Sequence, residues 1–379
     1  MKVCVVSHSA VVDAYREKFH HLAAAAPGLD LHLALPAFWP EGNRRVEAPS
    51  PGNERGVHLS VFPVRWAGKV GGFLMPGLAA WLRQERPDIL HLEEEPYALV
   101  GLQAARALPP AHGRVVFFTW ENILRKYKPP LNWIDGWMLK RADWALAGNH
   151  EAAEVLRQRG FVKNISVFPQ YGINPDVFTP AGAAAPAGVF TLGYMGRLLE
   201  EKGIHTLLAA AALLTFDFRL MIMGQGDAAE ALHALAARLG LANRVVFRPA
   251  VPHADMPAAY RELSVLVLPS ETRPAWKEQF GRVLTEAMAC GVPVLGSSSG
   301  EIPHVIGDAG LVFAEGDAGA LAGCLARLHA SAELRRDLAQ RGRARVLAEF
   351  TTGSVAQQTL EVYRQLAGGK KQEMPCVSP

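Results

Sequence analysis

Short runs of apolar residues without alternation recur along the chain, and most are followed by a segment with helical periodicity. A non-alternating apolar run bounded by turn residues is typical of a strand that is buried on both faces of a parallel sheet. Strands that alternate with helices predict an α/β fold with helices on both faces of the sheet. The expected strands are 3–7, 29–35, 88–92, 115–119, 144–147, 165–168, one that begins at 190, 220–223, 245–247, 265–268 and 292–295.

A change of composition divides this series into two halves. Residues 172–180 carry turn-forming Gly, Asn and Pro, and an Ala, Gly and Pro rich tract continues to residue 188, which predicts a linker. We therefore expect two Rossmann-like parallel-sheet domains, 1–180 and 189–354, that face each other across a cleft. Residues 321–366 have helical periodicity, and we expect residues 368–379 to form a disordered tail.

Two segments of the first half do not follow the alternation. Residues 36–56 hold several prolines, glycines and charges, and we expect a long loop there. Residues 66–83 mix apolar bulk with basic side chains, a composition compatible with peripheral contact to a membrane surface. Gly72 and Pro76 interrupt any continuous amphipathic helix, which favours a loop and a helix packed on the sheet.

Composition narrows the function classes. With 379 residues and 50% hydrophobic content, the chain can bury two sizeable cores. The net charge of +3 is mild, and without a base-reading module it argues against nucleic acid. The four cysteines are scattered, the N-terminus enters a strand at once, and every apolar stretch falls short of the ~20 residues of a membrane span. We expect a cytoplasmic protein in which Cys4 and Cys290 are small core residues.

The stretch 265–296 combines a buried strand, a polar loop and a helix that opens at Gly281. Its loop lies at the carboxyl end of a parallel strand, where open α/β sheets bind ligands. The amides of Gly281, Arg282 and Val283 form the start of this helix, a location that suits a phosphate. Glu278 and Glu286 stand on either side of them and can accept hydrogen bonds from sugar hydroxyls. By spacing alone, the two glutamates are equally compatible with solvated surface positions.

Two cations follow the first strand of the second half. Gly196 permits close backbone approach to a ligand, and Arg197 and Lys202 place positive charge where a helix begins. Beside a diphosphate, these cations would neutralise the charge that develops on the leaving group, a role that other transferases give to a metal. Taken alone, the pair is more readily explained as exposed side chains near acidic neighbours.

Other motifs point to a nucleotide but not to a dinucleotide cofactor. Gly224-x-Gly226 after a strand fits the dinucleotide fingerprint formally, yet the next strand ends without the acidic residue that binds a ribose. We interpret Gly224 and Gly226 as a tight turn beside a nucleotide. Because the chain has no Asp-x-Asp and its thirteen histidines are dispersed, we expect no metal site and no cofactor.

These motifs together resemble the family 4 retaining glycosyltransferases of GT-B fold. The resemblance rests on Glu278-x7-Glu286 with Phe280-Gly281 in between, on the Gly-Arg-x4-Lys-Gly pattern that begins at Gly196, and on residues 286–294 behind the glutamate pair. It implies an N-terminal domain that binds the acceptor, a C-terminal domain that binds the donor, and a last helix, 355–367, that crosses back to the first domain.

The resemblance also implies roles for individual residues. Glu278 holds hydroxyls of the transferred sugar, Glu286 the ribose, and Arg197, Lys202 and the amides of 281–283 the diphosphate, while Arg248 and Val251 border the base. Related enzymes often have Thr-x-His where this chain has Thr119-Trp120-Glu121, and its Ser7-His8-Ser9 turn lacks the family's glycine pair. As a hypothesis, Glu121 accepts a hydroxyl of the transferred sugar.

The expected function is a retaining, metal-independent transfer of a sugar from a UDP- or GDP-sugar to an acceptor hydroxyl, on a glycan or a lipid-linked glycan at the inner face of the membrane. Without an obvious nucleophile, the leaving phosphate would act as the base on the same face. Three alternatives stay open: a nucleotide-sugar epimerase of the same fold, an NAD(P)-dependent oxidoreductase and a catalytically silent nucleotide-sugar-binding protein.

Overall fold

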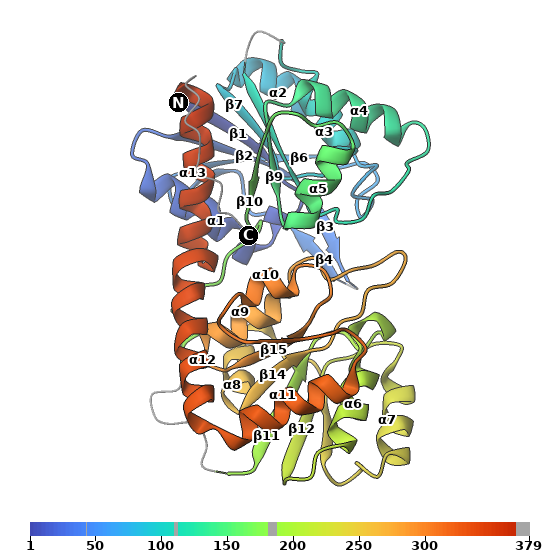
Figure 1. The fold of residues 1–379 in the computed structure, drawn as a ribbon. Helices are drawn as coiled ribbons and strands as arrows, with labels where there is room; N and C mark the ends of the chain where they lie inside the picture. Colours follow the sequence, from blue (N-terminus) through green and yellow to red (C-terminus); the bar gives the residue numbers. More distant parts are fainter. Residues whose placement is uncertain (43, 110–112, 181–187, 369–379) are drawn as a thin grey trace. The chain divides into compact units, whose positions relative to one another are not determined.

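The computed structural model describes residues 1–42, 44–109, 113–180 and 188–368 (Figure 1). The chain folds into two compact units, Met1–Gly172 together with the segment that starts at Thr352, and Ile173–Thr351. The chain passes from the first unit to the second at 172–173 and back at 351–352, whereas the predicted domains were 1–180 and 189–354. Most of the predicted tail, from residue 369 on, and residues 181–187 of the predicted linker lie outside the described residues.

The first unit contains an eight-stranded sheet with the order β10-β9-β8-β7-β1-β2-β6-β5, in which only the edge strand β5 runs antiparallel to its neighbour. Its strands are β1 (Lys2–Val6), β2 (Asp30–Pro36), β5 (Gly52–Glu54), β6 (Val57–Phe62), β7 (Ile89–Leu92), β8 (Arg114–Thr119), β9 (Trp144–Ala147) and β10 (Asn164–Val167). Its helices are α1 (Asp13–Ala25), α2 (Leu78–Glu85), α3 (Leu99–Ala105), α4 (Leu131–Arg141), α5 (His150–Gln158) and α13 (Thr352–Gly368), with a short 3-10 turn at Ser9–Val11.

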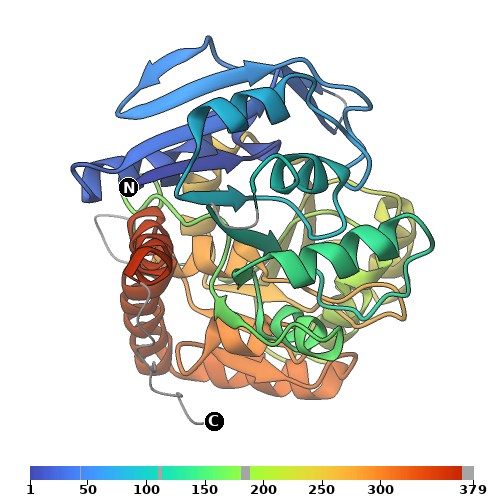
Figure 2. The same ribbon diagram turned by 90° about the horizontal axis from the view of Figure 1, so that it is seen from above.

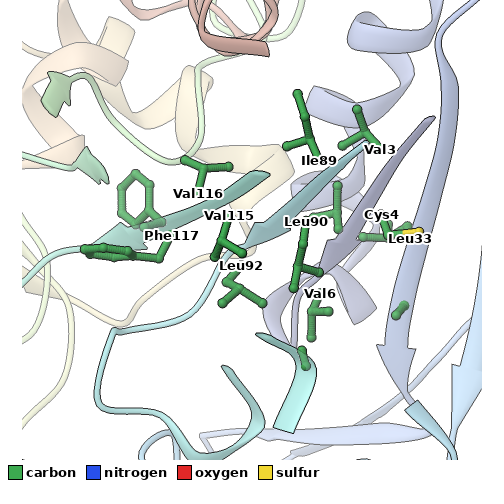
Figure 3. Close-up of a cluster of buried hydrophobic side chains, with 14 of the residues drawn as sticks. Val3, Cys4, Val6, Leu33, Ile89, Leu90, Leu92, Val115, Val116 and Phe117 are labelled. Atoms are coloured by element: carbon green, nitrogen blue, oxygen red, sulfur yellow. The ribbon is translucent and has the colours of Figure 1, made fainter. Parts of the chain in front are cut away.

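Side chains of the central strands form the core of this unit. Figure 3 shows apolar residues of β1, β2, β7 and β8, among them Val3, Leu33, Leu90 and Phe117, packed together with no exposed surface. Because the strands are covered on both faces, neighbouring positions along each strand are both buried, which is why the apolar runs do not alternate. Cys4 is buried in this core and Cys290 in the core of the other unit, as predicted.

Residues 36–56 are not the long loop that their composition suggested. The segment contains a hairpin of β3 (Phe38–Glu41) and β4 (Arg44–Glu47), followed by β5. The buried side chain of Trp39 lies opposite the half-buried Val46 in this hairpin, and this apolar pair offsets the cost of a proline in the strand. The prediction of a loop was therefore wrong.

The segment 66–83 forms a loop and the helix α2. Phe73, Met75, Leu78 and Leu82 are completely buried, which confirms the expectation of a loop and a helix packed on the sheet, whereas Trp66 is 59% exposed. Among the described residues, no helix combines the length and the hydropathy that crossing a membrane requires.

The last helix, α13, follows the second unit in sequence but belongs to the first unit. It packs against α1 and β7, and it lies beside α1 in both views (Figure 1, Figure 2). Val355, Leu360 and Tyr363 are buried along its inner face, with a spacing typical of an amphipathic helix.

The second unit contains a six-stranded parallel sheet with the order β13-β12-β11-β14-β15-β16. Its strands are β11 (Phe190–Met195), β12 (Phe218–Met223), β13 (Val245–Arg248), β14 (Val265–Leu268), β15 (Val294–Ser297) and β16 (Leu311–Phe313). Its helices are α6 (Ile204–Ala212), α7 (Ala229–Arg238), α8 (Met256–Arg261), α9 (Arg282–Ala289), α10 (Ile302–Ile306), α11 (Ala318–Ala330) and α12 (Ala332–Arg345), with 3-10 turns at Glu200–Lys202 and His253–Asp255 and a π-helical turn at Val346–Phe350. This is the strand order of the Rossmann fold, and the prediction of two Rossmann-like α/β domains is confirmed.

Candidate functional site

The strand order of the second unit identifies the edge where a ligand is expected. β11 and β14 are neighbours in the sheet, but the chain continues from β11 towards β12 and from β14 towards β15. Open α/β sheets bind ligands outside the carboxyl ends of the strands at such a reversal. The loops after β11, β12 and β14 carry most of the residues that the sequence singled out.

A pocket of about 270 Å³ lies at this edge. Five of the predicted residues line it, although they come from four separate segments of the chain: Gly196, Arg197, Gly224, Val251 and Val283. Met195, Met223, Gln225, Ala250 and Met256 complete its wall. The pocket is therefore a mostly apolar recess with a single cationic side chain among its lining residues, a combination that suits a base and an adjoining phosphate.

The guanidinium of Arg197 makes no hydrogen bond or ion pair with any residue that the structure describes, and its side chain is exposed. Its backbone is held instead, because the Tyr194 hydroxyl donates a hydrogen bond of 2.7 Å to the Arg197 carbonyl. Burial, together with the nearby Glu278 carboxylate, raises the pKa of Tyr194, so this donor keeps its proton. The backbone of Arg197 is thus held in place, while its guanidinium is available to an anionic ligand.

Glycine is required at the turns beside Arg197. A side chain on Gly224 would lie 1.8 Å from the carbonyl oxygen of Gly196, and one on Gly226 would lie 2.3 Å from that of Leu198. Both glycines have positive φ angles. Gly224 lines the pocket, but Gly226 does not. Glycine is needed at position 226 because the backbone of Leu198 packs closely against it.

Lys202 and Glu278 form an ion pair behind this turn. The Lys202 ammonium lies 2.6 Å from the Glu278 carboxylate, which also accepts a hydrogen bond of 2.8 Å from Ser270. The ammonium lies 4.6 Å from the centre of the Trp276 ring, and the Glu301 amide donates to the Glu278 carbonyl. Both side chains are largely buried, at 13% and 10% exposed, so the pair is a well-anchored element of the fold.

Helix α9 starts with no side-chain cap. Its N-cap is Gly281, with a φ of 80°, and a side chain there would approach Leu268 to 2.7 Å. Gly281 has no side chain to cap the first turn, the positive end of the helix dipole favours an anionic ligand there, and Val283 on the same turn lines the pocket.

Glu286 is buried, and its carboxylate contacts three side chains. The Tyr260 hydroxyl donates to one carboxylate oxygen at 2.7 Å, while His253 and Arg282 lie 3.2 Å and 3.0 Å from the other. Burial and the Glu286 carboxylate raise the pKa of Tyr260 well above its usual value, so the phenol remains a donor. No local pattern pointed to Tyr260 or Ser270, because each acts only through its hydrogen bond to a glutamate, 26 and 8 residues further along the chain.

Two further predicted residues lie outside the pocket lining. Arg248 forms an ion pair of 2.9 Å with Glu262, and Phe280 packs edge-on against Phe350 with ring centres 5.6 Å apart. These contacts give both residues a structural role, and the predicted role of each in ligand binding stays a prediction.

Glu121 belongs to the first unit, after β8, and its carboxylate is already bound by neighbours. It accepts a hydrogen bond from the Tyr127 hydroxyl and lies 2.9 Å from the Arg159 guanidinium. Its exposed fraction is 9%. The arrangement is that of a buried ion-pair network, and a role in binding the transferred sugar stays a prediction.

One group among the described residues of the first unit has donors suited to a metal ion, Asp30, His32 and His58. Their ligand atoms lie within 4.8 Å of one another, on β2 and β6. The group belongs to a different unit from the pocket, so it does not bear on the chemistry there.

Comparisons with known proteins agree with this geometry. A family model described as "Glycosyl transferases group 1" matches residues 180–345, and one described as "Glycosyltransferase Family 4" matches residues 20–177. A D-inositol 3-phosphate glycosyltransferase of Stackebrandtia nassauensis is 28% identical over 77% of this chain, and one of Streptomyces bingchenggensis is 32% identical over 60% of it. The matches span 66% and 54% of those two relatives.

Solved structures show the same fold. Sucrose-phosphate synthase from Thermosynechococcus elongatus superposes with a TM-score of 0.70 at 20% identity, covering 98% of this chain and 100% of that one. Anabaena HepE in complex with UDP superposes with a TM-score of 0.72 at 19% identity, covering 96% of this chain and 100% of that one.

Proposed function

Because the chain belongs to the group 1 glycosyltransferases and has their GT-B fold, we propose that it transfers a sugar from a nucleotide-diphosphate sugar to an acceptor hydroxyl. The observation that carries this proposal is the pocket of the second unit, which gathers Gly196, Arg197, Gly224, Val251 and Val283 at the reversal point of the sheet. A nucleoside diphosphate needs an apolar recess, a cation and backbone amides in this order.

The contacts support the following roles in binding the donor. The base lies in the apolar recess beside Val251, and the diphosphate lies between Arg197 and the uncapped start of α9. Glu286 accepts hydrogen bonds from the ribose, and its contacts with Tyr260, His253 and Arg282 hold the carboxylate in place for this role. Glu278 accepts hydrogen bonds from the transferred sugar while it remains paired with Lys202.

We propose that the transfer retains the anomeric configuration and uses no metal. Arg197 supplies a positive charge that is open to the diphosphate, and Lys202, which is paired with Glu278, is the second cation that we assign to the charge on the leaving group. Glu278 is a poor nucleophile, because Lys202 and Ser270 both bind the same carboxylate oxygen. The leaving phosphate then takes the proton of the acceptor hydroxyl on the same face of the sugar.

Relatives and neighbours suggest the substrates to test first. HepE was solved with UDP and with UDP-glucose, and the matched relatives are named D-inositol 3-phosphate glycosyltransferases. We therefore place UDP-glucose first among donors, ahead of GDP-sugars, and a polyol or a glycan, lipid-linked or free, among acceptors. A cytoplasmic location with peripheral membrane contact near the exposed Trp66 belongs to the same proposal.

Thermal unfolding in the presence of UDP, GDP, UDP-glucose, GDP-mannose and NADH tests the donor site. A ligand at ~100 times its Kd stabilises the folded state by about 2.7 kcal/mol. We expect stabilisation by one nucleotide and its sugar, and loss of it in Arg197→Ala but not in Arg219→Ala, a matched control with an exposed arginine on β12. Stabilisation by NADH alone, or by none of the nucleotides, would contradict the proposal.

The reaction itself separates the remaining alternatives. A transferase releases UDP from UDP-glucose in step with the amount of acceptor added, whereas an epimerase converts the sugar and releases none. A binding protein without activity would be stabilised by the nucleotide and would release no UDP with any acceptor.

A further inference from the structure

The sheet of the first unit has a reversal point of its own. β1 and β7 are neighbours, but the chain continues from β1 towards β2 and from β7 towards β8. The crevice outside the carboxyl ends of these two strands is therefore where this unit is expected to bind a ligand. His8 follows β1 by two residues, and Glu94 follows β7 by two residues.

These two residues form a pair across the reversal point. The Glu94 carboxylate accepts hydrogen bonds of 2.8 Å from the His8 backbone amide and from Nδ1 of its ring. The Glu94 side chain has no exposed surface, while that of His8 is 17% exposed. The ring packs against Trp39 and Phe73, with centres 4.4 Å and 5.8 Å away. The imidazole is thus fixed in orientation by its own turn, a carboxylate and two aromatic rings.

The second ring nitrogen of His8, Nε2, is not used in the pair with Glu94. Among the described residues, Nε2 has no hydrogen-bond partner, and the side chain retains some exposure. Because Glu94 accepts the Nδ1 proton, the neutral ring carries a lone pair on Nε2. A histidine that is bound by a carboxylate on one nitrogen and open on the other is arranged to accept a hydrogen bond from a hydroxyl.

The neighbouring carboxylates indicate what kind of group fits there. Glu93 is bound by Lys18 and Gln170, and Glu95 accepts hydrogen bonds from the Thr119 hydroxyl and the Trp120 amide. Lys18 and His8 pair with two of these glutamates, and burial raises the pKa of the third, Glu95, to about 7, so these contacts leave no cation in excess to bind an anion. An anionic ligand group is disfavoured beside them, whereas an uncharged hydroxyl is not.

We propose that the first unit binds an uncharged polyol at the carboxyl ends of β1 and β7, with one polyol hydroxyl donating to Nε2 of His8 and with Glu94 as the positioning residue. The inference rests on the proposed function, since this polyol is the hydroxyl-bearing end of the acceptor.

His8→Asn isolates the free nitrogen. The asparagine amide occupies approximately the position of Nδ1 and still donates to Glu94, but it removes Nε2. With UDP-glucose as donor and myo-inositol or methyl α-D-glucopyranoside as acceptor probe, we expect polyol-stimulated UDP release to fall about tenfold, the loss of one good hydrogen bond. The Kd for UDP and the slow hydrolysis of UDP-glucose by water should not change. His21→Asn, an exposed histidine on α1, is the matched control.

Glu94→Gln tests the positioning role. Burial disfavours charge on the His8 ring, but Glu94, together with Glu93 and Glu95, raises the pKa of His8 above its usual value, and the two aromatic neighbours carry no charge. Nε2 accepts a hydrogen bond only when the ring is neutral, so stimulated UDP release should decline as the pH falls through this pKa. Glu94→Gln should move that decline to lower pH, a change that a purely structural role would not produce.

Binding of the polyol can also be measured without turnover, which matters if the chosen polyol is a poor acceptor. In the full chain labelled with ¹⁵N-histidine, the Nε2 signal assigned by His8→Asn should shift when either polyol is added at millimolar concentration to the UDP complex. Unmoved His8 signals, or a His8→Asn variant with undiminished stimulation, would overturn the proposal. If the wild type fails to bind UDP at all, the proposed function fails instead, and the His8 signals are then tested with polyol alone.

Discussion

Replacing Lys202 by methionine should destabilise the second unit and abolish transfer for two separable reasons. The substitution keeps the apolar stem and removes the charge that lies 2.6 Å from Glu278. Breaking one side of a buried pair costs about 3–5 kcal/mol, because the remaining charge is left without compensation. Ser270 still donates to the Glu278 carboxylate, and the pair retains 13% and 10% exposure, so we expect the lower part of that range, about 3 kcal/mol.

A double-mutant cycle separates stability from chemistry. At roughly 2–4 °C per kcal/mol for a unit of this size, Lys202→Met should lower the unfolding temperature of the second unit by about 6–12 °C. Glu278→Gln should cost less, since the Lys202 ammonium keeps the Trp276 ring, and the double variant should recover much of the loss. Transfer, measured as UDP release with acceptor, should fall by about 10²–10³ in all three variants, because neither charge is restored in the double variant.

Two results would refute this reasoning. If Lys202→Met unfolds within about 1 °C of the wild type, the ion pair does not hold the loop, and the buried-pair argument fails. If the double variant regains transfer together with stability, Lys202 and Glu278 act only through the fold and not on the donor.

Three other substitutions test separate parts of the molecule. Tyr260→Phe removes the hydroxyl that donates to Glu286 at 2.7 Å, and it should lower the free energy of unfolding by about 2 kcal/mol and weaken UDP binding several-fold. If calorimetric titration gives an unchanged Kd for UDP, Glu286 does not belong to the nucleotide site. Burial raises the pKa of Glu95 to about 7, so between about pH 4.5 and about pH 7 the folded state holds a proton that the unfolded state has lost. The free energy of unfolding should therefore fall as pH rises through this range, and urea unfolding of Glu95→Gln should not show this fall. Glu121→Gln should lower kcat/KM about tenfold if the carboxylate binds the transferred sugar, whereas a change in thermal stability alone would assign Glu121 to the ion-pair network with Arg159.

The alternation of strands and helices and the loops that line the pocket could be predicted because their signals are local. A parallel strand buried on both faces is an apolar run in the sequence, as in the fully buried strand Val265–Leu268. Gly224 and Gly281 were recognisable because the backbone at a tight turn excludes a side chain, and the calculated approaches of 1.8 Å and 2.7 Å give the reason. The hairpin β3–β4 was missed because its stability depends on Trp39 meeting Val46, which no local pattern records.

The sequence by itself determined that the chain forms two α/β halves and that cations, glycines and carboxylates follow particular strands. Only the tertiary structure decided which of these residues meet: Arg197 and Val283 in one pocket, Tyr260 on Glu286, Lys202 on Glu278, and His8 on Glu94. The physical reason is that burial and backbone geometry are properties of a short segment, whereas a side-chain partner depends on how the sheet orders segments that are distant along the chain.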